Sequence, residues 1–132
     1  MTRKIGVEVD LARLLDPSAP ASLQEELLER TKLIRKEPYM QMMRAIATTD
    51  FREVLPKIAV PVLVLVGEHD RIAPPSIANY VAVRIPGAEK MVIAASGHVP
   101  NCEQPQAFNA IVRAFLQQHA DRATSHSAFS GK

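Results

Sequence analysis

The chain has 132 residues, 47% of them hydrophobic, which is the size and composition of one ordinary globular domain. Sixteen Lys and Arg residues against fourteen Asp and Glu residues give a net charge of +2, and only 5% of the residues are aromatic. A nucleic-acid partner is therefore not expected, because it would require a basic face or aromatic side chains that stack on bases.

Cysteine content and hydropathy bear on the cellular compartment and on membrane or metal binding. The single cysteine, Cys102, cannot form an internal disulfide, and no Cys-X-X-Cys pair suited to zinc is present. No apolar stretch approaches the roughly 18 residues of a membrane span, and the first ten residues lack the hydrophobic segment of a signal peptide. The sequence predicts a cytoplasmic protein with no membrane partner, no metal ion and no other cofactor.

Residues 1–49 carry weak, mainly helical signals. Val7 and Val9 alternate as in a short strand, whereas the leucines at 11, 14 and 15 favour a helical turn. Ser22 and Glu25 match the capping-box pattern, which predicts a helix over 23–36 that ends before Pro38.

A second helix is predicted over 38–48, with Pro38 at its first position. Its apolar side carries Tyr39, Met42, Met43 and Ile46, and ordinary core is the favoured interpretation of the methionines over a ligand surface.

The signal is strongest from residue 62 onward. The continuous apolar run over 62–66 predicts a strand, Pro75 opens a helix, and KMVIAA over 90–95 predicts a second strand. Both strands are predicted to be covered on both faces. Pro105 opens a last amphipathic helix that packs on the sheet, and residues 120–132 have little to bury and are predicted to be disordered. Strand, helix and strand form one βαβ unit, whose crossover is right-handed in nearly all proteins, so both strands point the same way.

Two residues with catalytic chemistry follow these strands. Asp70 comes after the first strand and His98 after the second, so both leave the carboxyl edge of a parallel pair, where α/β sheets bind ligands. A carboxylate that accepts the Nδ1 proton of an imidazole fixes its tautomer and leaves Nε2 free as a general base. Alone, each residue is more often a turn cap or an ordinary loop residue, but together they predict two-thirds of a catalytic triad.

The sequence resembles the carboxyl-terminal part of α/β-hydrolase family members in two segments, IAVPVLVLVGEHDRIAPP and MVIAASGHVPNCEQPQAFNAIVRAFLQQH. The resemblance covers residues 50–119 well and residues 20–49 loosely, the latter as the end of a helical cap. It implies an α/β fold, specifically a partial α/β-hydrolase fold, with a remnant of the cap over 1–49 and the core over 50–119. It also implies that Asp70 is the acid and His98 the base of a nucleophile–histidine–acid triad.

Other polar residues near the pair receive structural interpretations. Glu68 and His69 are interpreted as solvated loop residues rather than as groups that tune Asp70. Ser96 is a poor candidate nucleophile because it lies two residues before His98 in the same loop. An acid at Glu103 favours the amino end of the helix that begins at Pro105. A Cys102–His98 thiol pair is not favoured, because the sequence shows no oxyanion loop.

The nucleophile itself has no candidate in this sequence. The family carries it on an elbow with the pattern G-x-S-x-G, and none of the seven serines has glycine two residues before and two residues after it. Two interpretations follow. The chain is the carboxyl-terminal portion of a hydrolase for a small acyl substrate, such as an ester or lactone, with a homodimer or a complementing amino-terminal half as partner; or it is a stand-alone, non-catalytic binding module.

Overall fold

A computed structural model of the chain describes residues 10–127, so the expected strand at Val7 and Val9 lies outside the described residues. In chain order the elements are α1 (Leu11–Leu14), α2 (Ala21–Thr31), α3 (Lys36–Thr48), η1 (Leu55–Lys57), β1 (Leu63–Gly67), α4 (Pro75–Ala82), β2 (Glu89–Ile93), α5 (Pro100–Glu103) and α6 (Pro105–Ser127). None of the helices in this described part is long and apolar enough to cross a bilayer.

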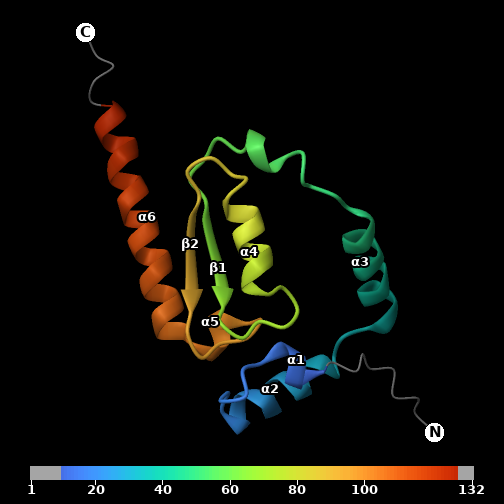
Figure 1. Ribbon diagram of the computed structural model, residues 1–132. Helices are drawn as coiled ribbons and strands as arrows, with labels where there is room; N and C mark the ends of the chain where they lie inside the picture. The colour runs from blue at the N-terminus through green and yellow to red at the C-terminus, as the bar shows by residue number, and fades with distance from the viewer. Residues whose placement is uncertain (1–9, 128–132) are drawn as a thin grey trace, which may run out of the picture.

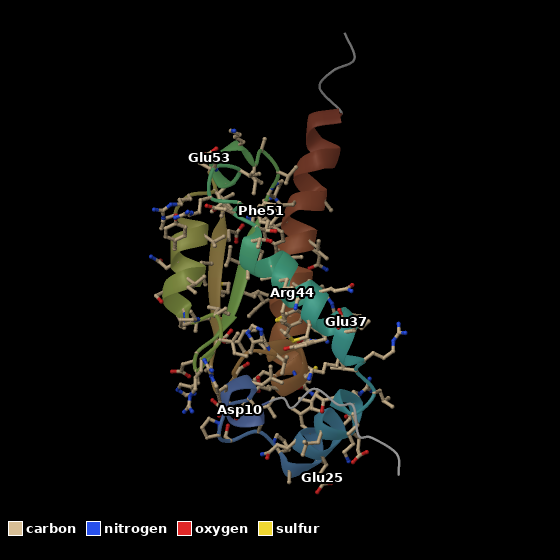
Figure 2. The ribbon with its side chains drawn as sticks, turned by 90° about the vertical axis from the view of Figure 1, so that its right-hand side faces the viewer. Asp10, Glu25, Glu37, Arg44, Phe51 and Glu53 are labelled. Carbon is tan, nitrogen blue, oxygen red and sulfur yellow. The ribbon has the colours of Figure 1, made fainter. Side chains whose placement is uncertain are left out.

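The βαβ unit is present as predicted. β1 and β2 pair in parallel, from Leu63 opposite Glu89 to Gly67 opposite Ile93, and α4 connects them. The strands lie between α4 and α6 in two perpendicular views (Figures 1 and 2). This arrangement confirms the predicted α/β fold class.

Burial of the strands differs from the prediction. The apolar runs indicated strands covered on both faces, yet in β2 the side chains of Met91 and Val92 are 44% and 46% exposed. The buried residues gather toward the carboxyl ends, where Val66 and Ile93 are 4% and 3% exposed. The prediction of full cover is wrong for β2, because α4 and α6 leave part of the strand pair open.

The two helices before the strands begin and end elsewhere than predicted. α2 starts after Pro20, with no side-chain cap, so Ser22 is inside the helix and the capping-box prediction is wrong. α2 ends at Thr31 rather than at 36, and α3 starts at Lys36, two residues before Pro38. A proline is tolerated there because N–H groups in the first turn have no partner within the helix.

α2 and α3 bury none of their residues. Met42 is 50% exposed and Ile46 is 61% exposed, so the interpretation of the methionine cluster as ordinary core is wrong. Figure 1 shows α3 set apart from β1, and Figure 2 shows Glu37 and Arg44 along it. The apolar side of α3 therefore has no cover among the described residues.

The last helix lies beside β2 in Figure 1. Its Ile111 and Phe115 line an apolar pocket of about 340 Å³ together with Leu63 of β1 and Met91 of β2. α6 continues to Ser127 and therefore extends past Ala120, where the sequence predicted disorder. Residues 128–132 lie outside the described residues.

Candidate functional site

The loops that follow β1 and β2 touch each other closely. Beyond the strands, the backbone N–H of Glu68 donates to Ile93 O and that of His69 donates to Ser96 O, each at 2.9 Å. A Cβ on Gly67 would lie 2.0 Å from Gly97 O and 2.4 Å from Ser96 O, so only glycine fits there. The fold therefore brings both loops to one edge of the sheet.

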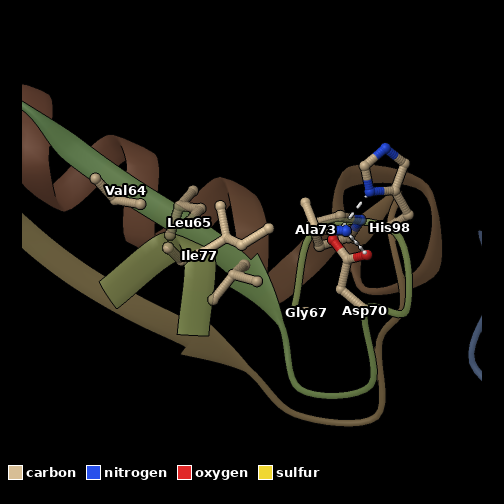
Figure 3. A pocket seen from close by; sticks show the side chains of 10 residues that line it. Val64, Leu65, Gly67, Asp70, Ala73, Ile77 and His98 are labelled. Carbon is tan, nitrogen blue, oxygen red and sulfur yellow. Dashed lines mark hydrogen bonds and ion pairs between the residues drawn. The ribbon is translucent and has the colours of Figure 1, made fainter. Parts of the chain in front are cut away.

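Asp70 lies in the first of these loops with its side chain 6% exposed. One carboxylate oxygen, Oδ1, accepts hydrogen bonds from the backbone N–H groups of Ile72 and Ala73, each at 2.8 Å. The other, Oδ2, lies 2.9 Å from Nδ1 of His98 (Figure 3). The backbone thus fixes the carboxylate and directs its free oxygen at the imidazole.

The pKa of Asp70 reflects this environment. Burial acts to raise the pKa, but the N–H of Ala73, the ring of His98 and the N–H of Ile72 stabilise the carboxylate, and together they place the pKa below its usual value. Asp70 is consequently an anion at neutral pH and acts as a hydrogen-bond acceptor for His98.

His98 lies in the loop between β2 and α5. Its backbone N–H donates to Leu14 O at 2.7 Å, and its side chain is 36% exposed. Figure 3 shows the second ring nitrogen pointing away from Asp70. With Nδ1 bonded to Asp70, Nε2 is directed outward and is available to exchange a proton with a group outside this loop.

A pocket of about 250 Å³ adjoins the pair (Figure 3). Asp70 and His98 line it at one end, together with Ile77 of α4 and the consecutive β1 residues 64–67. Consecutive strand residues point to opposite faces, so a pocket that touches all of them lies against the strand's edge. No β2 residue lines it, which places the pocket along the edge of β1 that β2 does not pair with.

Sequence reasoning missed Asp16, which is 5% exposed. Its carboxylate accepts hydrogen bonds from the backbone N–H of Ser18 at 2.8 Å and from the Ser18 hydroxyl at 2.5 Å, and it pairs with Nδ1 of His69. The Ser18 hydroxyl, His69 and the Ser18 N–H, in that order, lower the pKa of Asp16 to about 2. The pairing with Asp16 raises the pKa of His69.

The neighbouring polar residues contact the loops rather than Asp70. The side chains of Glu68 and His69 are 49% and 52% exposed, in line with the interpretation as solvated loop residues that do not tune Asp70. Each also makes one contact between loops: Glu68 accepts a hydrogen bond from the N–H of Ala95 at 3.1 Å, and His69 pairs with Asp16. Ser96 is fully buried, with no hydrogen-bond partner for its hydroxyl among the described residues. Cys102 is exposed.

Glu103 belongs to the end of α5 instead of the amino end of α6. Its carboxylate accepts hydrogen bonds from the backbone N–H groups of Gly97 at 2.9 Å, Val99 at 3.3 Å and Asp16 at 2.6 Å. The predicted capping of the helix that begins at Pro105 is therefore wrong, because the side chain turns back onto the loop that carries His98. Across the described residues, no cluster of three or more His, Cys, Asp or Glu side chains could hold a metal ion.

Comparisons with known proteins give related folds. A family model described as alpha/beta hydrolase fold matches residues 37–105. A pimeloyl-[acyl-carrier protein] methyl ester esterase from Neisseria meningitidis is 32% identical over 118 residues, which cover 89% of this chain. A 3-oxoadipate enol-lactonase from Acinetobacter baylyi is 35% identical over 82 residues, or 62% of this chain.

Among solved structures, the enol-lactonase from Burkholderia xenovorans superposes with a TM-score of 0.69 at 31% identity and covers 81% of this chain. The matches span 32%, 30% and 42% of the three relatives' own lengths, so this chain corresponds to less than half of each.

Proposed function

Because the chain belongs to the alpha/beta hydrolase fold family, we propose that it supplies the acid, Asp70, and the base, His98, of a triad that hydrolyses a small acyl substrate. The observation that carries this proposal is the 2.9 Å contact between Oδ2 of Asp70 and Nδ1 of His98. In this proposal residues 50–119 are the carboxyl-terminal part of the hydrolase core, and residues 1–49 are a remnant of the cap.

The chemistry follows from the geometry of the pair. Asp70 accepts a hydrogen bond from Nδ1–H of His98 and thereby holds the imidazole in the tautomer whose Nε2 is unprotonated. Nε2 then removes the proton from an attacking hydroxyl, and the buried carboxylate stabilises the imidazolium that forms. His98 next returns the proton to the leaving alcohol or enol as its bond to the acyl carbon breaks, which leaves the acyl group on the nucleophile. Nε2 then removes a proton from a water molecule that attacks the acyl carbon, and His98 returns this proton to the nucleophile as the acid product leaves.

The nucleophile comes from outside these 132 residues in this proposal, since none of the seven serines has the G-x-S-x-G pattern. The pocket along β1 is the place for the segment that carries it, because β1 has an unpaired edge there and Asp70 and His98 lie at its end. Strands that extend the sheet from this edge would bring a turn that carries the nucleophile to the same carboxyl edge at which His98 lies. The partner is thus an amino-terminal hydrolase segment.

The substrate class rests on the relatives. The curated relatives described above are named for a methyl ester and an enol-lactone, and both substrates contain an acyl–oxygen bond. A small ester or lactone is therefore the proposed substrate class.

The test begins with the DNA directly upstream of Met1. Any segment there that encodes G-x-S-x-G is expressed with this chain, and hydrolysis of 4-nitrophenyl acetate and labelling by a fluorophosphonate are measured for each part and for the combination. We expect activity and serine labelling in the combination, and no adduct on this chain alone. Asp70→Asn should lower turnover by about 10⁴-fold, as loss of the orienting acid does in a serine protease.

The matched control is Asp50→Asn, because Asp50 is an exposed carboxylate that pairs with Arg52. This variant should keep the turnover of the unmodified combination. A stoichiometric adduct on a serine of this chain alone, or a loss below tenfold for Asp70→Asn, would contradict the proposal. A complex that forms without any hydrolysis would favour the non-catalytic binding module instead.

A further inference from the structure

One carboxylate holds the backbone on both sides of His98. Oε1 of Glu103 accepts the N–H of Gly97 at 2.9 Å and that of Val99 at 3.3 Å. The other oxygen, Oε2, accepts the N–H of Asp16 at 2.6 Å, across 87 residues of sequence. An ionised carboxylate suits this position because it is purely an acceptor and can serve several donors at once.

Residues 14–16, which include the Asp16 N–H bonded to Glu103, also contact the histidine loop, residues 94–99 between β2 and α5. Leu14 O accepts the N–H of His98 at 2.7 Å. A Cβ on Gly97 would lie 2.7 Å from Leu14 O and 2.8 Å from Asp16 N, so the two backbones pack without space for a side chain. Leu15 and Asp16 are 4% and 5% exposed. The backbone of His98 is therefore enclosed between residues 14–16 and the side chain of Glu103.

Capping of α5 accounts for only part of this arrangement. The bond from Val99 to Glu103 satisfies an N–H at the start of α5, which is an ordinary function for an acid near a helix amino end. The bonds from Gly97 and Asp16 satisfy groups outside any helix, on either side of the contact with His98. These two bonds fix where the histidine loop lies.

We propose that Glu103 is a positioning residue for His98, which holds the histidine loop against residues 14–16 so that Nδ1 of the imidazole meets Oδ2 of Asp70. The inference rests on the proposed function, because it explains how the acid and the base are kept in register. Asp70 is fixed by its own loop through Ile72 and Ala73. The imidazole of His98 must reach the carboxylate of Asp70. The two side-chain torsions of His98 can place Nδ1 there only if the backbone of the loop is already in position.

The experiment uses the full chain and compares Glu103→Ala, Glu103→Gln and the control Glu53→Gln, which replaces an exposed acid distant in sequence from the loop. Amide hydrogen exchange is followed at Gly97, Val99 and Asp16. The chemical shifts of the His98 ring nitrogens, recorded where the ring is neutral, report its tautomer. Asp70→Asn is measured in the same way as a test of the pair itself.

In Glu103→Ala we expect exchange at Gly97, Val99 and Asp16 to accelerate about tenfold, the effect of losing one hydrogen bond. The His98 ring should shift from the Nδ1–H tautomer toward the mixture of tautomers found in a free histidine side chain. Glu103→Gln keeps one acceptor oxygen, so we expect a smaller change in the same direction. Glu53→Gln should match the unmodified chain in both measurements.

Faster exchange with an unchanged His98 tautomer would overturn the inference, because Glu103 would then be a structural residue only. Unchanged exchange in both Glu103 variants would also overturn it. If Glu103→Ala does not fold, Glu103→Gln decides by the same criteria. An unchanged tautomer in Asp70→Asn would refute the proposed function directly, whereas failure confined to the Glu103 variants would refute only the positioning role.

Discussion

Two regions of the molecule contrast sharply: the carboxyl edge of the strands, and the helices α2 and α3. At the edge, Leu15, Asp70 and Ser96 are 4%, 7% and 0% exposed, and hydrogen bonds join segments far apart in sequence. α2 and α3 bury no residue, and their side chains form hydrogen bonds to residues nearby in sequence. Local stability follows buried contacts and long-range bonds. The site is therefore the most constrained part of the described chain, and the helices before it are the least constrained.

The largest expected effect comes from removing the close approach at the edge. Gly67→Ala places a Cβ 2.0 Å from Gly97 O and 2.4 Å from Ser96 O, both backbone atoms, so the two loops must separate. We expect a loss of about 3 kcal/mol in the free energy of unfolding, measured by urea titration.

The control for this change is Gly87→Ala, at a glycine with φ of +73° and no atom within 4 Å of the added Cβ. Its cost should be about 1 kcal/mol, from the left-handed backbone alone. An equal or smaller cost for Gly67→Ala would show that the two loops do not touch in solution.

The second prediction concerns the unpaired edge of β1. Two paired strands are marginal as an independent sheet, and among the described residues α2 and α3 do not cover them. We expect the isolated chain to form dimers through this edge or to remain loosely packed and bind apolar dyes. Sedimentation equilibrium at several concentrations, combined with thermal unfolding, tests this. A concentration-independent monomer that unfolds sharply and binds no dye would contradict it.

The third prediction is that the free energy of unfolding depends on pH through the pair of Asp16 and His69. The pKa of His69 lies above its ordinary value of 6.5, chiefly because of the hydrogen bond to Asp16, with Glu68 adding to the rise, and burial and Arg71 opposing it. The pair's contribution to the free energy of unfolding is therefore complete below pH 6.5 and is lost as the pH rises through the folded pKa.

Asp16 sets the acid limit of the pair's contribution to the free energy of unfolding. Its pKa falls from 3.8 to about 2, so the contribution is present above pH 3.8 and is lost as the pH falls toward 2. Unfolding of the unmodified chain and of His69→Gln is compared across this range. The difference between them should shrink above pH 6.5. A difference that grows with pH would contradict the assignment.

The smallest effect is expected on α3. Ile46 is 61% exposed, so Ile46→Ser should change the free energy of unfolding by less than about 0.5 kcal/mol. Ile93, which is 3% exposed at the end of β2, provides the comparison: Ile93→Ala should cost about 2 kcal/mol. A cost above about 1 kcal/mol for Ile46→Ser would show that α3 packs against the rest of the chain.

The positions of Asp70 and His98 could be predicted because they depend on local signals. Each follows an apolar run, and a parallel βαβ unit necessarily brings the ends of its strands to one edge. For the same reason, the predicted start of each strand lies within one residue of the observed start. The boundary between α2 and α3 was less predictable, because Pro38 is compatible with any position in the first turn of a helix.

Asp16 and Glu103 could not be predicted from the sequence. The word DPS indicates that Asp16 bonds to Ser18 in a local turn, but no pattern points to His69, 53 residues away. Glu103 bonds only to backbone N–H groups, which every residue other than proline presents, so no side-chain pairing marks its partners. Such contacts follow from the packed backbone and not from residue types.

The bond between Glu103 and Asp16 also has a consequence for chain entropy. Asp70 and His98 close a loop of 28 residues, whereas Glu103 and Asp16 close one of 87. For a flexible chain the longer closure costs only about 1 kcal/mol more, since the cost grows with the logarithm of length. A segment inserted within residues 17–62 lengthens the second loop and leaves the first unchanged. The region of α2 and α3 can therefore vary in length at little energetic expense while the acid and the histidine keep their geometry.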